Sequence, residues 1–128
     1  MTNQEIYTAT LRLLGEPSDE DRTEDYAERA PYILANFISD NAAVDKQYRR
    51  FTGAEEITVK HSIYVPLADE FPLSPRFATA AQFYLAYLLV SEEDPTRSDM
   101  FFDRFCTAIS TIPAELPATR EKILNLYS

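Results

Sequence analysis

Residues 74–90 constrain the fold most, because they combine a helix start signal with apolar side chains on nearly every side. Ser74 is a favourable N-cap residue, and Pro75 suits the first helical position, where no backbone N–H is needed. A helix that is apolar nearly all round belongs in a core. We therefore expect the other elements to pack around it. The apolar positions are Phe77, Ala80, Ala81, Phe83, Tyr84, Leu85, Tyr87, Leu88, Leu89 and Val90.

The balance of glycine and proline favours helices over a sandwich or a barrel. Only 2 glycines accompany 8 prolines, which leaves few positions for tight turns that need a positive φ. A chain of 128 residues is the size of one ordinary domain and needs no disulfide or metal to fold. The sequence predicts a single all-α domain over residues 1–128. We expect a compact bundle of four to five helices around the buried central helix, with one short β-like or extended insertion.

The first helix is expected over residues 2–14. Thr2 and Glu5 have the spacing of a capping box, in which the hydroxyl and the carboxylate satisfy backbone N–H groups at the helix start. Gly15 is then the natural residue to end the helix in a left-handed conformation.

A second helical pattern begins at residue 23 or 24. Pro31 lies inside it and removes an interior hydrogen bond, which predicts either a kinked helix or two short ones. Residues 39–41 separate this pattern from a further helical piece over residues 42–51.

The last strong helical pattern follows a break at residues 91–95, with Thr96 or Ser98 as its cap. Its apolar stripe is expected to cover the central helix in an antiparallel orientation. Pro113 then predicts an extended passage into a C-terminal tail, residues 113–128, that docks on a neighbour. The stripe consists of Phe101, Phe102, Phe105, Cys106, Ile109 and Ile112.

Charge limits the classes of partner. The net charge of −9 argues against a surface built to hold phosphate backbones, which requires clustered Lys and Arg. Residues 16–25 are strongly acidic but lack the glycine and spacing of a calcium-binding EF-hand loop, so we expect a solvated loop and the first turn of the next helix. The densest basic spot is Lys46, Arg49 and Arg50, which forms a solvated face, a contact for an acidic partner or a contact for DNA.

Chemistry-bearing residues are sparse, and we expect no enzyme activity, no cofactor and no metal. There is no glycine-rich phosphate loop and no Ser/His/Asp set. His61 is the single histidine and is expected to be an ordinary surface or strand residue. Cys106 is the single cysteine and is expected to be a buried thiol, because it shares the apolar stripe.

The amino-terminal residues carry no targeting signal. Residues 1–6 have neither a basic n-region nor an apolar h-region, and no later run is long enough to span a bilayer. We therefore expect a cytosolic protein without membrane contact.

Residues 57–65 depart from the helical period. Ile57, Val59, Ile63 and Val65 alternate with polar or aromatic residues, which is the spacing of a strand. Two interpretations remain open. Residues 56–66 form either a self-paired hairpin on the bundle, or a loosely ordered arm that joins a neighbouring protein by strand pairing or by burying Ile63, Tyr64 and Val65.

Four stretches, in this order, resemble the small helical head–tail connector (adaptor) proteins of long-tailed bacteriophages and prophages. The resemblance covers most of the chain, but it consists of packing and capping motifs and not of active-site signatures. The stretches are residues 9–16 (ATLRLLGE), 26–34 (YAERAPYIL), 69–77 (DEFPLSPRF) and 101–106 (FFDRFC).

The resemblance implies a structural virion protein that forms a ring, by family analogy of twelve copies, between the portal and the tail. Its partners would be copies of itself, the portal and neighbouring neck or tail proteins, with DNA only passing through the ring. It would lie in the bacterial cytoplasm during assembly and then in the virion neck. The alternatives are a tail-completion protein or a bacterial cytosolic helical interaction module.

A ring that closes through head-to-tail contacts needs two different complementary patches on each chain. Asp21 and Glu24 in the acidic stretch and the three basic residues named above are the candidate pair of patches, with Ile63, Tyr64 and Val65 as a further candidate contact.

Overall fold

The computed structural model describes residues 1–15 and 21–116. These ranges contain the helices α1 (Asn3–Leu14), α2 (Asp21–Thr52), α3 (Ala78–Val90) and α4 (Pro95–Ala114), and the 3-10 turn η1 (Pro75–Phe77). They contain no strand, and a single isolated bridge joins Thr2 to Glu70. The prediction of an all-α chain is confirmed.

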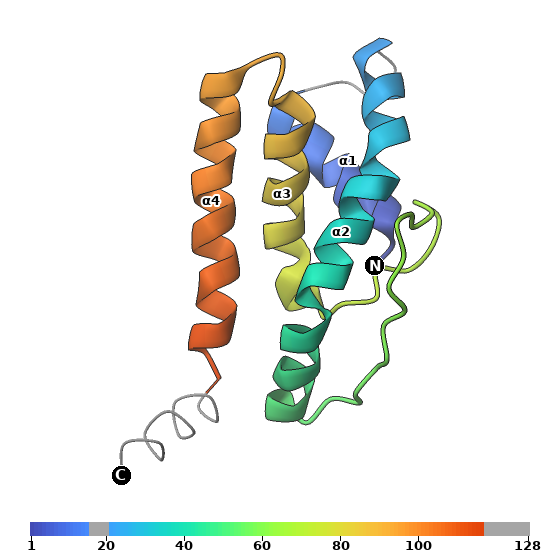
Figure 1. Cartoon of the computed structure of the whole chain (residues 1–128), viewed down its shortest axis with the longest axis vertical. Coiled ribbons are helices and arrows are strands. Elements are labelled where there is room, and N and C mark those ends of the chain that lie inside the picture. The colour runs from blue at the N-terminus through green and yellow to red at the C-terminus, as the bar shows by residue number, and fades with distance from the viewer. Residues whose placement is uncertain (16–20, 117–128) are drawn as a thin grey trace.

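Three helices lie side by side, with α3 between α2 and α4, and α1 lies behind them (Figure 1). The chain runs in one direction along α2 and α4 and in the other along α3. α3 packs against α1, α2 and α4. Phe77, Ala81 and Leu85 are completely buried at this junction.

Both ends of α1 follow the sequence signals. The Glu5 N–H donates a hydrogen bond of 3.1 Å to Thr2 Oγ1, and Gly15 ends the helix with a φ of 72°. A residue of α4 also caps the C-terminal end of α1, because the Arg97 guanidinium donates to the carbonyls of Leu13 and Leu14 at 3.3 and 2.9 Å. These two bonds hold the end of α1 on the start of α4.

Gly15 provides a first testable prediction. No described residue lies within 4 Å of a Cβ added there, so among these residues the cost of Gly15→Ala comes from the left-handed backbone alone. We expect the substitution to lower the free energy of unfolding by about 1 kcal/mol, measured by urea denaturation. A change below about 0.3 kcal/mol would contradict this geometry.

α2 is one continuous helix of 32 residues, so the predicted separation at residues 39–41 is wrong. Asn41 is buried, and its side-chain Nδ2 donates 2.9 Å to the Phe37 carbonyl one turn earlier. Phe37 and Ile38 are buried on the same face, and this packing outweighs the turn preference of the polar residues. Pro31 lies inside the helix without ending it.

The capping bonds at the starts of α3 and α4 differ from those predicted. Ser74 precedes η1, but its hydroxyl donates to Asp45 and makes no capping bond. Asp94, and not Thr96 or Ser98, caps α4 by accepting the Arg97 N–H at 3.1 Å. Ser98 Oγ instead donates 2.8 Å to the Tyr87 carbonyl and thereby joins α4 to α3.

The predicted stripe of α4 is only partly in the core. Phe101 and Ile112 are buried and Phe105 is half-buried, but Phe102 is 44% exposed. Cys106 is exposed, so the prediction of a buried thiol is wrong. It lies one residue beyond Phe105, and a rotation of 100° per residue turns its side chain toward solvent.

The C-terminal boundary is later than predicted. Pro113 lies inside the last turn of α4, and the chain leaves the helix only at Glu115. The predicted tail at residues 117–128 lies outside the described residues.

Candidate interaction surface

The segment between α2 and η1, residues 53–74, contains no hairpin and no strand, so the self-paired hairpin is wrong. In place of the ladder of backbone hydrogen bonds that a hairpin would form, the Val65 N–H donates a 3.2 Å bond to the Pro31 carbonyl on α2. Val59 and Val65 are half-buried, whereas Ile57 is 44% and Ile63 80% exposed. Of the four apolar residues in this alternating pattern, two therefore face the helical bundle and two face solvent, although the segment forms no strand.

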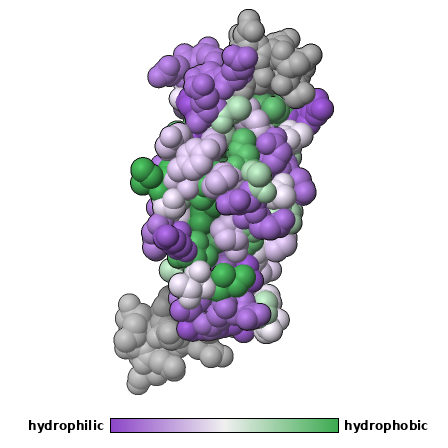
Figure 2. Space-filling view, turned by 90° about the vertical axis from the view of Figure 1, so that its right-hand side faces the viewer, coloured by the Kyte–Doolittle hydropathy of each residue, from purple (hydrophilic) through white to green (hydrophobic). Residues whose placement is uncertain are grey.

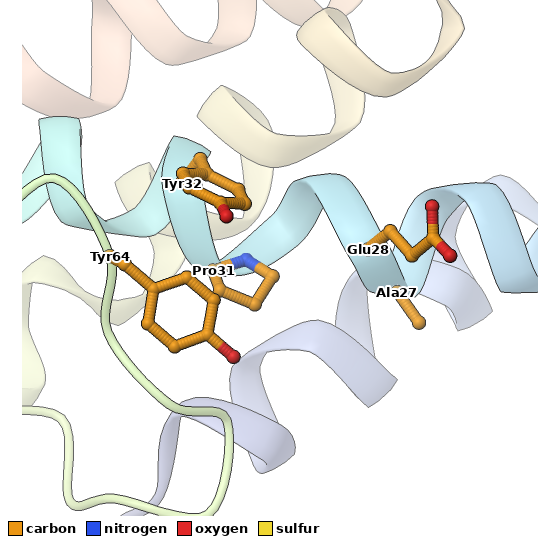
Figure 3. A pocket seen from close by; sticks show the side chains of 5 residues that line it. All are labelled: Ala27, Glu28, Pro31, Tyr32 and Tyr64. Atoms are coloured by element: carbon orange, nitrogen blue, oxygen red, sulfur yellow. The ribbon is translucent and has the colours of Figure 1, made fainter.

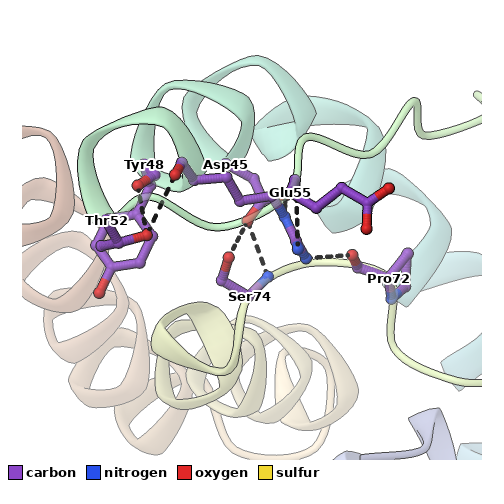
Figure 4. A network of polar contacts seen from close by, with 7 residues as sticks. Asp45, Tyr48, Thr52, Glu55, Pro72 and Ser74 are labelled. Atoms are coloured by element: carbon purple, nitrogen blue, oxygen red, sulfur yellow. Dashed lines mark hydrogen bonds and ion pairs between the residues drawn. The ribbon is translucent and has the colours of Figure 1, made fainter.

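A polar network holds the two ends of this segment on α2 (Figure 4). The Asp45 carboxylate is 1% exposed and accepts 2.8 Å bonds from Arg49 Nε and from the Ser74 N–H, and a 2.6 Å bond from Ser74 Oγ. Arg49 also donates to the carbonyls of Glu55 at 3.4 Å and Pro72 at 3.1 Å. We call this network the Asp45 clamp.

The middle of the segment presents an apolar tip. The hydroxyl of Ser62 donates 2.7 Å to the Tyr64 carbonyl and accepts 3.2 Å from the Tyr64 N–H, which turns the chain at Ile63. The Tyr64 ring packs edge-on against Tyr32 of α2, with 5.1 Å between ring centroids (Figure 3). Ile63 therefore projects into solvent from a segment that Tyr64 and Val65 anchor.

Two shallow depressions lie on either side of Tyr32, which is 52% exposed. One, of about 490 Å³, is lined by Ala27, Glu28, Pro31, Tyr32 and Tyr64 (Figure 3). The other, of about 540 Å³, is lined by Glu28, Arg29, Tyr32, Ile33, Asn36 and Leu88. From the side of α2 and the 53–74 segment, hydrophobic surface emerges in separate clusters between hydrophilic ones (Figure 2).

The predicted acidic and basic residues lie at opposite ends of α2. Asp21 and Glu24 belong to its first turn, and Lys46 and Arg50 are exposed near its last turn. The 25 residues from Asp21 to Lys46 correspond to about 37 Å of helix. Arg50 pairs with Glu56, and hydrogen bonding from Arg50 is the main cause that lowers the pKa of the Glu56 carboxyl.

Arg49 differs from the other two basic residues. Its side chain is 14% exposed and belongs to the Asp45 clamp. The structure therefore leaves Lys46 and Arg50 at the exposed basic end of α2, and it joins Ile63, Tyr64 and Val65 in one stretch on the flank of the same helix.

Sequence reasoning missed Tyr32. The apolar face of α2 recurs through Tyr26, Ala30, Leu34 and Phe37, and Tyr32 falls between those positions. An aromatic residue off the apolar face of an amphipathic helix predicts an exposed ring.

Among residues 1–15 and 21–116, no group of three or more His, Cys, Asp or Glu side chains could hold a metal ion. Within the same ranges, no helix has both the length and the apolar character that a membrane crossing requires. No protein-family model, no curated protein and no solved structure matches the chain.

Proposed function

We propose that this chain is a structural subunit that joins copies of itself head to tail in a ring. The observation that carries the proposal is the apolar surface of Ile63, Tyr64 and Tyr32, held in place on α2 by the contacts of Tyr64 and Val65. An exposed isoleucine and two exposed tyrosines are large apolar side chains left in water, and side chains of this kind are enriched at interaction sites.

The charges at the ends of α2 support a head-to-tail arrangement. A rigid helix separates an acidic end from a basic end, and each chain then offers two different complementary patches, as a closed ring requires. Exposed ion pairs contribute only about 0–1 kcal/mol each, so the charges would orient assembly more than drive it. The apolar surface around Ile63 would supply the larger part of the affinity.

The resemblance of the sequence to head–tail connector proteins gives the ring its proposed role. The ring would join the portal of a DNA-filled head to the tail, after assembly in the bacterial cytoplasm. The net charge of −9 suits a lumen through which DNA slides without binding. The central position of α3 would give each subunit a rigid core.

Solution mass provides the first test. Multi-angle light scattering and negative-stain microscopy should give rings that are large multiples of 14.6 kDa, alone or when a portal is added. A species that stays monomeric over the whole concentration range, with and without a portal, would contradict the proposal and favour an interaction module.

A charge-reversal experiment tests the orientation. Lys46→Glu with Arg50→Glu should weaken assembly at least about tenfold, and Asp21→Lys with Glu24→Lys in the same chain should partly restore it. Arg49 stays unchanged, because its loss would disturb the Asp45 clamp. Sedimentation velocity at several concentrations gives the assembly constants.

The control for that experiment carries the same change in net charge elsewhere. Arg12→Glu with Arg104→Glu alters two exposed residues on α1 and α4 and should leave assembly within about threefold of the unmodified chain. Equal losses in both double variants would show a nonspecific effect of net charge.

Ile63→Asp tests the apolar tip. Because Ile63 is 80% exposed, the free energy of unfolding should change by less than about 0.5 kcal/mol, while assembly falls at least about tenfold. Urea denaturation and sedimentation velocity measure the two effects. Unchanged assembly would remove Ile63 from the interface.

A further inference from the structure

Among the helices of residues 1–15 and 21–116, none lies over one face of α3. α1 lies behind α3, and α2 and α4 lie on its two sides (Figure 1). Tyr84, Tyr87 and Leu88 on α3 are only half-buried, although they belong to a helix whose other side chains are largely in the core. α2 and α4 approach each other across this face through Phe37 and Phe105, whose ring centroids are 6.4 Å apart.

Aromatic rings lie along this face. Tyr84 lies 5.2 Å from Phe105, and Tyr87 lies 5.1 Å from Phe102 and 5.9 Å from Phe105, measured between ring centroids. Phe102 is 44% exposed, and burial raises the pKa of both tyrosines. Beyond Tyr87, Leu88 and Ile33 lie in a depression that the polar side chains of Glu28, Arg29 and Asn36 also line. We call this surface the aromatic groove, made of Ile33, Tyr84, Tyr87, Leu88, Phe102 and Phe105.

The dimensions of the aromatic groove suit a short helix. The stretches 33–40 on α2 and 102–109 on α4 each span about 10 Å, or two helical turns. A helix of two to three turns with one apolar face would bury that face against the rings, as in the helix-in-groove mode of recognition.

Acidic side chains border the aromatic groove. Asp40 of α2 lies near enough to Tyr84 to contribute to its raised pKa, after burial and Tyr87. On α4, Asp99 and Asp103 are exposed and lie three residues before and one residue after Phe102. Arg104, also exposed, follows Asp103, and Arg29 lines the depression beside Leu88. The border therefore carries charges of both signs and favours an occupant that has both beside its apolar residues.

Residues 117–128 have this composition. Ile123, Leu124 and Tyr127 are spaced so that a helix would place them on one face, and Arg120, Glu121 and Lys122 precede them. Twelve residues give a helix of about 18 Å, enough to cover the groove. They follow Leu116, which is buried at the end of α4 and fixes the point from which this segment starts.

We propose that residues 117–128 of one copy dock in the aromatic groove of the next copy. The inference rests on the proposed head-to-tail assembly and names a second contact for it. Pro117 disfavours helical conformations at Leu116, the last described residue, which lies outside α4. The segment and the groove are different parts of the chain, so their contact is heterologous, as a ring requires.

The single cysteine provides a direct test in the full-length chain. Cys106 is exposed on α4 beside the aromatic groove. It lies close to Tyr87, whose pKa is raised mainly by burial and to a smaller extent by Cys106. We expect Tyr127→Cys to form interchain disulfides with Cys106 under mild oxidation, giving a ladder of linked chains on non-reducing gels. The variant with both Tyr127→Cys and Cys106→Ser should give at most dimers.

A mixing experiment identifies the copy that supplies the segment. When the unmodified chain is mixed with the Cys106→Ser, Tyr127→Cys variant, a heterodimer should exceed either homodimer at least about fivefold. An intrachain disulfide in the single Tyr127→Cys variant, with no ladder, would overturn the proposal in favour of docking on the same chain. In the same mixing experiment, Asp69→Cys with Cys106→Ser places the cysteine at an exposed position outside the segment. A heterodimer yield for Tyr127→Cys no higher than the yield for Asp69→Cys would overturn docking altogether.

Substitutions in the aromatic groove separate this inference from the proposed function. Phe102→Glu and Leu124→Glu should each reduce the heterodimer yield at least about fivefold. Met100→Glu is the matched control, because Met100 is 40% exposed on the same helix and lies about 200° around it from Phe102. Rings that form unchanged in both groove variants would overturn the inference. If rings are then lost only in the Lys46 and Arg50 variant, the proposed function still stands.

Discussion

Leu85→Ala should lower the free energy of unfolding by about 2–5 kcal/mol, the range for emptying a packed core site. Leu85 is completely buried on α3, the helix that packs against the three others. The leucine one turn later, Leu88, is half-buried at the aromatic groove. Leu88→Ala should therefore cost clearly less than Leu85→Ala in the same urea denaturation.

The comparison of Leu85→Ala with Leu88→Ala tests which face of α3 is buried in the bundle. Equal costs above about 2 kcal/mol would mean that the aromatic groove is closed in solution. Costs below about 0.5 kcal/mol for both would mean that α3 is not the centre of the bundle.

Asp45→Ala should lower the free energy of unfolding by about 3–5 kcal/mol, because it removes the carboxylate of a buried ion pair and leaves the Arg49 charge without its opposite charge. The Asp45 carboxylate accepts bonds from Arg49 Nε and from both donors of Ser74. Its loss would release the start of η1 and the end of the 53–74 segment together. Urea denaturation measures the cost, and amide exchange at Ser74 shows where it arises.

A matched aspartate and a double-mutant cycle make this result specific. Asp40→Ala changes an exposed residue on the same helix and should cost less than about 0.5 kcal/mol. Combined with Arg49→Ala, Asp45→Ala should show a coupling energy of about 0.5–3 kcal/mol, because the two side chains act in one network. If the unfolding free energies lost in the two single variants simply add up in the double variant, the interaction between Asp45 and Arg49 does not contribute to stability.

The sequence predicted the helices where local signals and packing agree. Thr2, Gly15 and the apolar stretch after Pro75 ended up as the spacing indicated. It failed where a distant side chain decides the outcome. Asn41 signals a turn in the sequence, yet its burial on the core face of α2 keeps it helical. No local pattern reveals that Ser74 will donate to Asp45, 29 residues away.

The candidate surface shows the same division. Period-two alternation at Ile57, Val59, Ile63 and Val65 correctly marked an unusual segment, but a strand also needs a partner backbone, which spacing cannot supply. Likewise, Arg49 and Arg50 are neighbours of equal charge in the sequence. Because successive helical residues are 100° apart, one points to the buried Asp45 and the other to solvent.

The backbone of the 53–74 segment also closes the start of α1, and this has a consequence for the order of folding. The Asn3 and Gln4 N–H groups donate 2.9 and 2.7 Å to the carbonyls of Asp69 and Leu67, and the Asn3 side chain donates 3.0 Å to the Pro66 carbonyl. These donors and acceptors are about 63 residues apart, so at about 5–20 residues per second the ribosome needs about 3–13 s to supply the acceptors. During synthesis, α1 should therefore wait with an open first turn until more than half of the chain has emerged, and it should acquire its exchange protection after α2.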